Sequence, residues 1–83
     1  MMQLTLYQFE DCPYCAKVRA KLDEKTLRYQ TINVPRDRES PIRKEIARNS
    51  GVMTIPVLKL TKDSQEQWIG ESNEIIAYLD ENF

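Results

Sequence analysis

The sequence predicts an α/β fold in which three helices cover a four-stranded mixed sheet. Short segments rich in β-forming residues alternate with segments whose apolar residues recur at helical spacing. Their order along the chain is β-α-β, then α, then β-β-α. The first connection is a crossover long enough for a parallel strand pair, whereas the last two strands are close enough for a hairpin. All 83 residues are expected to form one domain, 1–83.

The first half of the chain predicts a strand, a helix and a second strand. In residues 4–9 (LTLYQF), apolar and more polar side chains alternate and β-forming residues are frequent, which favours a strand. A helix is expected from Cys12 to about Lys25, because Pro13 suits a first helical position and apolar residues follow at helical spacing. Residues 29–34 (YQTINV) predict the second strand, which a polar connection, PRDRE, follows.

The middle helix has the clearest boundaries in the sequence. Ser40 followed by Pro41 is typical of a helix start, because serine can cap the first turn and proline has no N–H to leave unpaired. The helix is expected to run to about Asn49. Gly51 is expected to end it, since glycine adopts the left-handed conformation that closes many helices.

The last third of the chain predicts a hairpin and a helix. Residues 56–60 (PVLKL) and 66–69 (EQWI) predict two strands, joined by a turn at TKDSQ. The tripeptide GES leads into the last helix, whose body is expected at residues 73–80, with Ser72 as its N-cap.

The composition argues against several classes of function. The chain has 12 basic and 13 acidic residues, largely interspersed, whereas a nucleic-acid-binding protein more often shows a basic excess. It contains no histidine, which excludes an imidazole base or metal ligand within this chain. No apolar run approaches the roughly 20 residues that span a bilayer, and the first residues do not resemble a secretory signal. We therefore expect a cytoplasmic protein without nucleic-acid or membrane partners.

The two cysteines, Cys12 and Cys15, admit four interpretations. A closed zinc site needs four ligands, so two cysteines without histidine would require a second chain. A structural disulfide would close a loop too short to constrain the unfolded chain, and the cytoplasm disfavours it. Two buried, inert cysteines are a third possibility. The fourth interpretation, a redox pair, is favoured because Cys-X-X-Cys precedes a helix in a βαβ unit.

Position on the expected helix gives the two thiols different roles. Cys12 lies at the helix start, where unpaired N–H groups and the helix dipole favour an anion and lower the pKa of a thiol. Cys15 lies a turn further on, on the same face and less exposed. Cys12 is thus the expected attacking sulfur and Cys15 the resolving one. Lys17 would favour the thiolate, whereas Glu10 and Asp11 would oppose it.

Two further stretches each admit a structural and a functional interpretation. In MTIPV, Pro56 is either a strand-edge proline or a cis-proline that presents the backbone of Ile55 to a peptide-like ligand. In GESNEII, Ser72 and Glu71 either cap the last helix or, with its N–H groups, bind a charged amino-acid-like group.

Taken together, these stretches make the chain resemble a glutaredoxin. CPYC at residues 12–15 is the motif of dithiol glutaredoxins, and TIP at residues 54–56 is similar to the TVP loop of that family. GES at residues 70–72 departs from the usual glutaredoxin pattern and resembles the Glu-Ser pair of glutathione transferase N-terminal domains. IIAYLDENF near the end is also transferase-like. The resemblance covers nearly the whole chain.

The resemblance implies a thioredoxin-like fold, glutathione as co-substrate and reductant, a cis Pro56, and no metal. It also implies a set of glutathione-binding residues: Ile55 at the cysteinyl part, Glu71 and Ser72 at the γ-glutamyl end, Arg43 toward the glycine carboxylate, and Tyr14 beside the ligand. Many glutaredoxins carry lysine three residues before the first cysteine, where this chain has Phe9. We expect no helical domain after Phe83, and conjugation of electrophiles is therefore not the expected main activity.

The resulting prediction is a glutathione-dependent thiol–disulfide oxidoreductase, expected to act as a monomer. It would reduce protein disulfides and protein–glutathione mixed disulfides through Cys12 and Cys15. Two alternatives come from other classes of function. One is an iron–sulfur cluster carrier in which two chains and two glutathiones hold the cluster, although Pro13 and Tyr14 argue against it. The other is a non-catalytic, transferase-like binding module with idle thiols.

Overall fold

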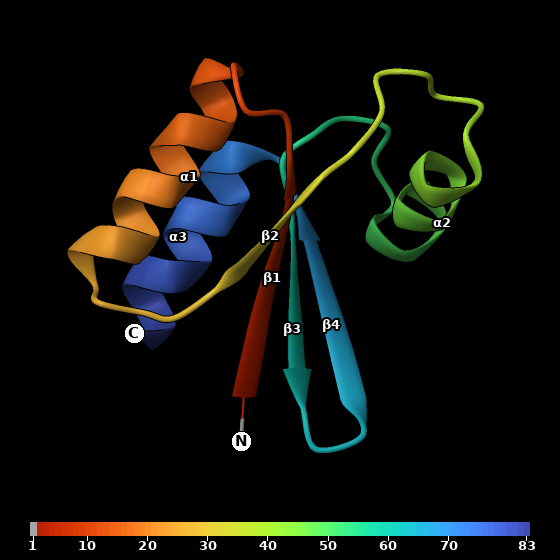
Figure 1. Ribbon diagram of the computed structural model, residues 1–83. Helices are drawn as coiled ribbons and strands as arrows, with labels where there is room; N and C mark the ends of the chain where they lie inside the picture. The colour runs from red at the N-terminus through yellow and green to blue at the C-terminus, as the bar shows by residue number, and fades with distance from the viewer. Residues whose placement is uncertain (1) are drawn as a thin grey trace.

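The computed structural model describes residues 2–83 and confirms the predicted order of elements (Figure 1). The strands and helices are β1 (Met2–Gln8), α1 (Pro13–Glu24), β2 (Gln30–Asn33), α2 (Pro41–Ser50), β3 (Val57–Lys62), β4 (Gln65–Gly70) and α3 (Ser72–Asn82). No helix among these residues is long and apolar enough to cross a membrane.

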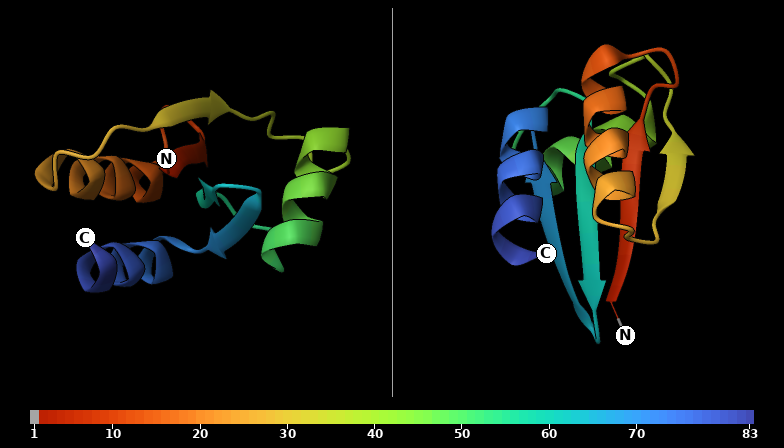
Figure 2. Two further views of the ribbon diagram at one scale, coloured as in Figure 1. Left: turned by 90° about the horizontal axis from the view of Figure 1, so that it is seen from below. Right: turned by 90° about the vertical axis from the view of Figure 1, so that its left-hand side faces the viewer.

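The four strands form one mixed sheet in the order β2-β1-β3-β4. β1 pairs in parallel with β2, as the crossover through α1 predicts, and antiparallel with β3, which forms a hairpin with β4. Helices α1 and α3 lie on one face of the sheet, and α2 lies on the other (Figure 2). This arrangement confirms the expected thioredoxin-like fold.

The face under α1 and α3 carries a core that we call the aliphatic cluster. Alternate residues of β1 and β3 point to this face, and they meet the apolar stripes of the two helices. All its members are nearly or fully inaccessible to solvent: Leu4, Leu6, Val18, Leu22, Leu58, Leu60, Ile75 and Leu79. At about 1.5–3 kcal/mol for each fully buried side chain, this cluster is a large source of stability.

A second core, which we call the site cluster, lies toward the end of the sheet where α1 begins. Its buried members are Tyr7, Cys15, Val34, Ile46, Ile55 and Val57, with Phe9, Cys12 and Trp68 among the half-buried side chains packed against them. The rings of Tyr7 and Trp68 stack with their centroids 5.5 Å apart. The buried members of this core therefore include an aromatic ring and a sulfur atom, whereas those of the first core are all aliphatic.

Two predicted details of the last third are wrong. The turn between β3 and β4 is tighter than expected: Asp63 adopts a left-handed backbone (φ 57°), so strand pairing continues to Lys62 and Gln65. Ser72 is the first residue of α3 and not its N-cap. Glu71 occupies the N-cap position, with φ 68° and no capping hydrogen bond from its side chain.

The middle helix begins and ends close to the predicted residues, but its serine does not cap it. Ser40 occupies the N-cap position, yet its side chain makes no capping hydrogen bond. Gly51 ends the helix in the expected left-handed conformation, with φ 80°. Its N–H donates to the carbonyl of Ala47, which satisfies one of the last unpaired carbonyls of α2.

Candidate thiol–disulfide site

Cys12 and Cys15 lie at the start of α1, at the end of the sheet where the site cluster lies. Cys12 is the N-cap residue with an extended backbone, and its carbonyl accepts the first helical hydrogen bond, from Ala16, at 3.0 Å. Pro13 follows at the first helical position, as predicted. Both thiols are free. Cys12 is partly exposed, whereas Cys15 is fully buried.

The environment of Cys12 favours its thiolate. Partial burial alone would raise the pKa of this thiol, but hydrogen bonds from the backbone N–H groups of Cys15 and Tyr14 oppose that effect. The Cys15 thiol and the positive charge of Arg36 oppose it too, and the net result is a lowered pKa. A lowered pKa increases the fraction of the nucleophilic form near neutral pH.

The environment of Cys15 has the opposite effect. Burial, helped by the neighbouring Cys12, raises the pKa of Cys15 to about 11, so this thiol holds its proton at neutral pH. Its sulfur nevertheless accepts a hydrogen bond from the backbone N–H of Phe9 at 3.5 Å. The two thiols, one helical turn apart, are therefore chemically distinct.

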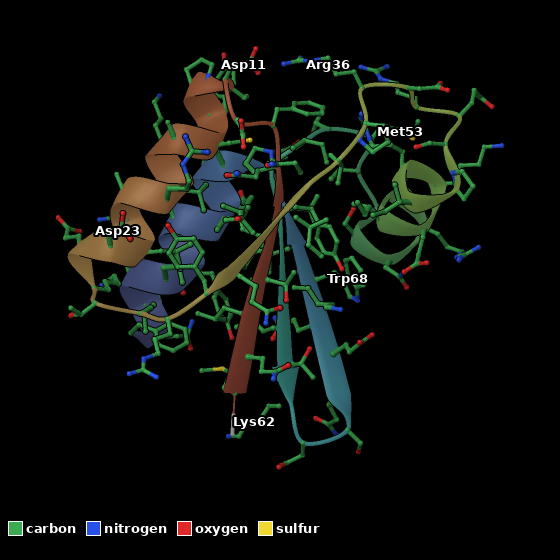
Figure 3. The ribbon with its side chains drawn as sticks, viewed as in Figure 1. Asp11, Asp23, Arg36, Met53, Lys62 and Trp68 are labelled. Carbon is green, nitrogen blue, oxygen red and sulfur yellow. The ribbon has the colours of Figure 1, made fainter. Side chains whose placement is uncertain are left out.

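Arg36 is a functional candidate that the sequence did not single out. It lies in the connection between β2 and α2, forms an ion pair with Asp11, and places its guanidinium 4.5 Å from the centroid of the Phe9 ring. Figure 3 shows Asp11 and Arg36 reaching toward one another at this end of the molecule. The predicted cation, Lys17, instead lies over the Tyr14 ring at 5.7 Å.

A hollow of about 360 Å³ lies beside the thiols and brings together most of the predicted ligand-binding residues. It is lined by Tyr14, Thr54, Ile55, Pro56, Glu71, Ser72 and Asn73. The Ile55–Pro56 peptide bond is cis, as the resemblance implied. The first residues of α3 border the hollow, and the N–H groups of a first helical turn have no intrahelical acceptor. The sequence did not identify Thr54 and Asn73, whose residue types carry no specific signal.

Arg43 does not line this hollow. It is buried, and its guanidinium donates to the carbonyls of Pro35 at 2.9 Å and Met53 at 3.1 Å. Its guanidinium also lies 5.4 Å from the Phe9 ring centroid. Arg43 thus ties the β2–α2 connection to the loop that carries Thr54, Ile55 and Pro56.

Gly70 allows this loop to approach the end of β4. A Cβ atom at position 70 would lie 2.2 Å from Cγ2 of Val52, closer than two carbon atoms can pack. Glu71, directly after it, adopts a positive φ that is rare for residues with a side chain. These two backbone features place Glu71 and Ser72 at the edge of the hollow.

The fold and the site define a thioredoxin-like protein with a thiol pair at a helix start, beside a cis-proline hollow. Residues 6–83 match the family model described as Glutathione S-transferase, N-terminal domain, and the chain belongs to this family. Among residues 2–83, no three or more histidine, cysteine or acidic side chains gather in a way that could hold a metal ion.

The chain is also related to glutaredoxins. It is 30% identical to Glutaredoxin 3 of Escherichia coli (strain K12) over 77 residues, which cover 93% of this chain and 86% of that protein. It is 37% identical to Prostaglandin E synthase 2 of Mus musculus over 78 residues, but spans only 19% of that protein's length. The resemblance to glutaredoxins is thus confirmed over most of the chain.

A solved structure supports the same assignment. Maleylacetoacetate isomerase from Anaeromyxobacter dehalogenans 2CP-1, which has GSH bound in its active site, matches with a TM-score of 0.73 and 26% identity. The match covers 96% of this chain and 37% of that one. The chain therefore corresponds to about a third of this larger structural relative.

Proposed function

We propose that the protein is a glutathione-dependent thiol–disulfide oxidoreductase that uses Cys12 as nucleophile and Cys15 as resolving thiol. One observation carries the proposal: the two thiols differ in the way that two-step exchange requires. Cys12 is accessible and its pKa is lowered, whereas Cys15 is buried and its pKa is about 11. Thiol–disulfide exchange proceeds through attack by a thiolate, so the first attack falls to Cys12.

The first reaction is the reduction of a protein–glutathione mixed disulfide. The Cys12 thiolate attacks the glutathione sulfur, a Cys12–glutathione disulfide forms, and the protein thiolate leaves and takes a proton from water. The thiolate of a second glutathione then attacks the glutathione sulfur of that disulfide. Oxidised glutathione and the Cys12 thiolate are the products: one free glutathione thiol has been consumed, and the disulfide bond of the substrate has become that of oxidised glutathione.

The second reaction is the reduction of a protein disulfide and needs both cysteines. Cys12 attacks one substrate sulfur and releases the other as a thiolate. Cys15, once deprotonated, attacks the Cys12 sulfur, which releases the second substrate thiolate and leaves a Cys12–Cys15 disulfide. Two glutathione molecules reduce that disulfide and become oxidised glutathione.

We place glutathione in the hollow beside Tyr14. The backbone of Ile55, next to Pro56, would pair with the cysteinyl part, and Glu71 and Ser72 at the start of α3 would hold the γ-glutamyl end. Arg43 fixes the loop by donating to the carbonyls of Pro35 and Met53, and its remaining N–H donors would be directed toward the glycine carboxylate. Both thiols and the hollow lie on one chain, so a monomer suffices, and the cytoplasmic glutathione pool would supply the electrons.

The experiment is reduction of a small glutathione mixed disulfide, coupled to NADPH oxidation by glutathione reductase. We expect turnover by the wild type, none by Cys12→Ser, and substantial activity retained by Cys15→Ser. With insulin disulfides as substrate, both variants should lose activity. Turnover by Cys12→Ser, or its absence in a correctly folded wild type, would contradict the proposal.

A further inference from the structure

Four polar residues form a closed ring of hydrogen bonds around the backbone of Phe9: three bonds join side chains, and the fourth goes to the backbone carbonyl of Glu10. Arg19 of α1 donates to the side-chain oxygen of Gln8 at 2.5 Å, and Gln8 donates to Asn33 at 3.0 Å. Asn33 donates to the carboxylate of Glu10 at 2.9 Å, and a second Arg19 nitrogen lies 3.4 Å from the carbonyl of Glu10. We call these four residues the Arg19 ring.

The ring fixes the backbone on both sides of Phe9. Gln8 and Glu10, its neighbours in sequence, are both members, and the Gln8 carbonyl also accepts a hydrogen bond from Val34 at 3.0 Å. Between them, the Phe9 N–H is directed at the sulfur of Cys15. A hydrogen bond from a fixed N–H stabilises a thiolate more than a thiol, because the anion is the stronger acceptor.

The Arg19 ring affects the pKa of the resolving thiol, Cys15, and not that of the attacking thiol, Cys12. Burial raises the pKa of Cys15 most, while the Phe9 N–H and the charge of Arg19 lower it, and Cys12 raises it. When Cys12 enters a mixed disulfide it no longer carries a negative charge, so its repulsion of a Cys15 thiolate disappears. The favourable effects of the Phe9 N–H and Arg19 remain.

We propose that Arg19 is a positioning residue for the resolving step: by closing the ring, it holds the Phe9 N–H and a positive charge against Cys15 when Cys15 attacks. This inference rests on the proposed function, because it assigns a structural cause to its second chemical step. Neither Arg19 nor its partners touch the hollow in which glutathione is placed.

The other groups around Cys15 leave this role to the ring. Besides Arg19, the titratable neighbour of Cys15 on α1 is Cys12. From β1, Tyr7 belongs to the same site cluster as Cys15. From α2, the buried cation Arg43 lies 5.4 Å from the Phe9 ring centroid, and Arg36 of the preceding connection lies 4.5 Å from it. Arg43 is engaged by the carbonyls of Pro35 and Met53, and Arg36 by Asp11. The apolar neighbours are Val34, which directly follows β2, Ile46 of α2 and Val57 of β3. Glu10 is the carboxylate of the ring, and Asn33 engages it. Arg19 is the cation that lowers the pKa of Cys15.

A test that needs no glutathione can separate the two steps. The reduced protein is mixed rapidly with an aromatic disulfide whose released thiolate is coloured. Attack by Cys12 releases one coloured thiolate per protein, and attack by Cys15 on the resulting mixed disulfide releases the second. The two phases report the first attack and the resolving step, and each is measured as a function of pH.

We expect Arg19→Gln to slow the second phase by roughly five- to tenfold, the effect of losing about one ordinary net hydrogen bond. Its rate profile should also move to higher pH, while the first phase stays within about twofold of the wild type. Arg19→Lys, which keeps the charge without the two-pronged geometry, should recover part of the loss. Lys21→Gln, which removes a charge from the same helix outside the ring and whose partners are Glu24 and Asp80, should leave both phases unchanged.

The proposal is overturned if the second phase of Arg19→Gln keeps its rate and pH profile, or if both phases slow equally. Circular dichroism establishes that each variant is folded, and if Arg19→Gln loses structure, the same two criteria are applied to Arg19→Lys. Glutathione turnover is scored separately, so a protein with two clear phases and no turnover would refute the proposed function while the role of Arg19 stood.

Discussion

The two cores of this protein differ in composition and in the interactions that stabilise them, although both lie against the same sheet. The buried members of the aliphatic cluster, between the sheet and helices α1 and α3, are leucine, isoleucine and valine alone. The site cluster near α2 contains a buried thiol and aromatic rings, and a buried guanidinium, Arg43, lies next to it. Polar groups inside a protein need partners, so the site cluster depends on individual hydrogen bonds where the aliphatic cluster depends on apolar area.

This difference teaches where stability and chemistry can be separated. A small chain has few residues with which to build a core. Here, the helices that carry most of the apolar packing also deliver the start of α1 and the start of α3 to the site. The site cluster then sets the properties of the thiols. Substitutions in the aliphatic cluster should therefore change mainly the free energy of unfolding, and substitutions around the site cluster should also change thiol reactivity or ligand binding.

The largest effect on stability is expected in the aliphatic cluster. Leu6→Ala, at a fully buried position, should lower the free energy of unfolding by about 2–5 kcal/mol through lost burial and a residual cavity. Denaturant unfolding measures the loss. The pH dependence of Cys12 alkylation in the folded protein should stay unchanged. A shift of the Cys12 pKa by about one unit or more would show that the two cores are not separable.

The next effect is a pH dependence that arises in the site cluster. The pKa of Cys15 is raised from 9.0 to about 11 in the folded state, so the folded state binds this proton more tightly. Its contribution to stability is complete below pH 9.0 and is lost as the pH rises toward about 11, up to roughly 3 kcal/mol. The difference between wild type and Cys15→Ala, measured by unfolding at several pH values, should show this loss. A difference that is independent of pH would contradict it.

A smaller effect on stability, with a larger one on binding, is expected at Arg43. Arg43→Met keeps the apolar stem and removes the donors to Pro35 and Met53, which should cost about 1–2 kcal/mol. Because Met53 precedes the residues that line the hollow, the KM for glutathione should rise. Arg38→Met, an exposed substitution in the same connection, is the matched control. An unchanged KM would show that the loop keeps its place without Arg43.

The smallest effect is expected at Arg36. Arg36→Gln removes a positive charge that lowers the pKa of Cys12, so this pKa should rise and alkylation of Cys12 should need a higher pH. Its exposed ion pair with Asp11 should contribute less than about 1 kcal/mol to stability. Loss of reactivity without any change in the pH profile would place the role of Arg36 elsewhere.

Local sequence patterns predicted the order of elements because each element carries its own periodicity and end signals, such as Pro13, Pro41 and Gly51. They also predicted the asymmetry of the thiols, which follows from position on a helix. They could not predict Arg36, because its contacts with Asp11 and Phe9 join residues 25 or more apart in sequence. The Arg19 ring was missed for the same reason, since it joins α1, β1 and β2.

The wrong details have equally physical causes. Glu71 adopts a positive φ that its residue type rarely takes, so tertiary packing decided the true start of α3. Asp63 belongs to the few residue types that adopt this conformation readily, which allows the tight turn. The role of Arg43 toward the glycine carboxylate stays a prediction: two of its five N–H donors bind the carbonyls of Pro35 and Met53, contacts that the motif did not reveal. A residue's position in a motif does not reveal which neighbours will satisfy it.

The tight turn at Asp63 and Ser64 has a practical consequence. It lies at the far end of the sheet from the start of α1, so the thiol pair and this turn occupy opposite ends of the molecule (Figure 1). Ser64 is exposed and belongs to neither core. A reporter dye, a surface tether or a short inserted tag attached there would leave the exchange chemistry free, which makes the hairpin tip a natural handle for building a redox sensor from this fold.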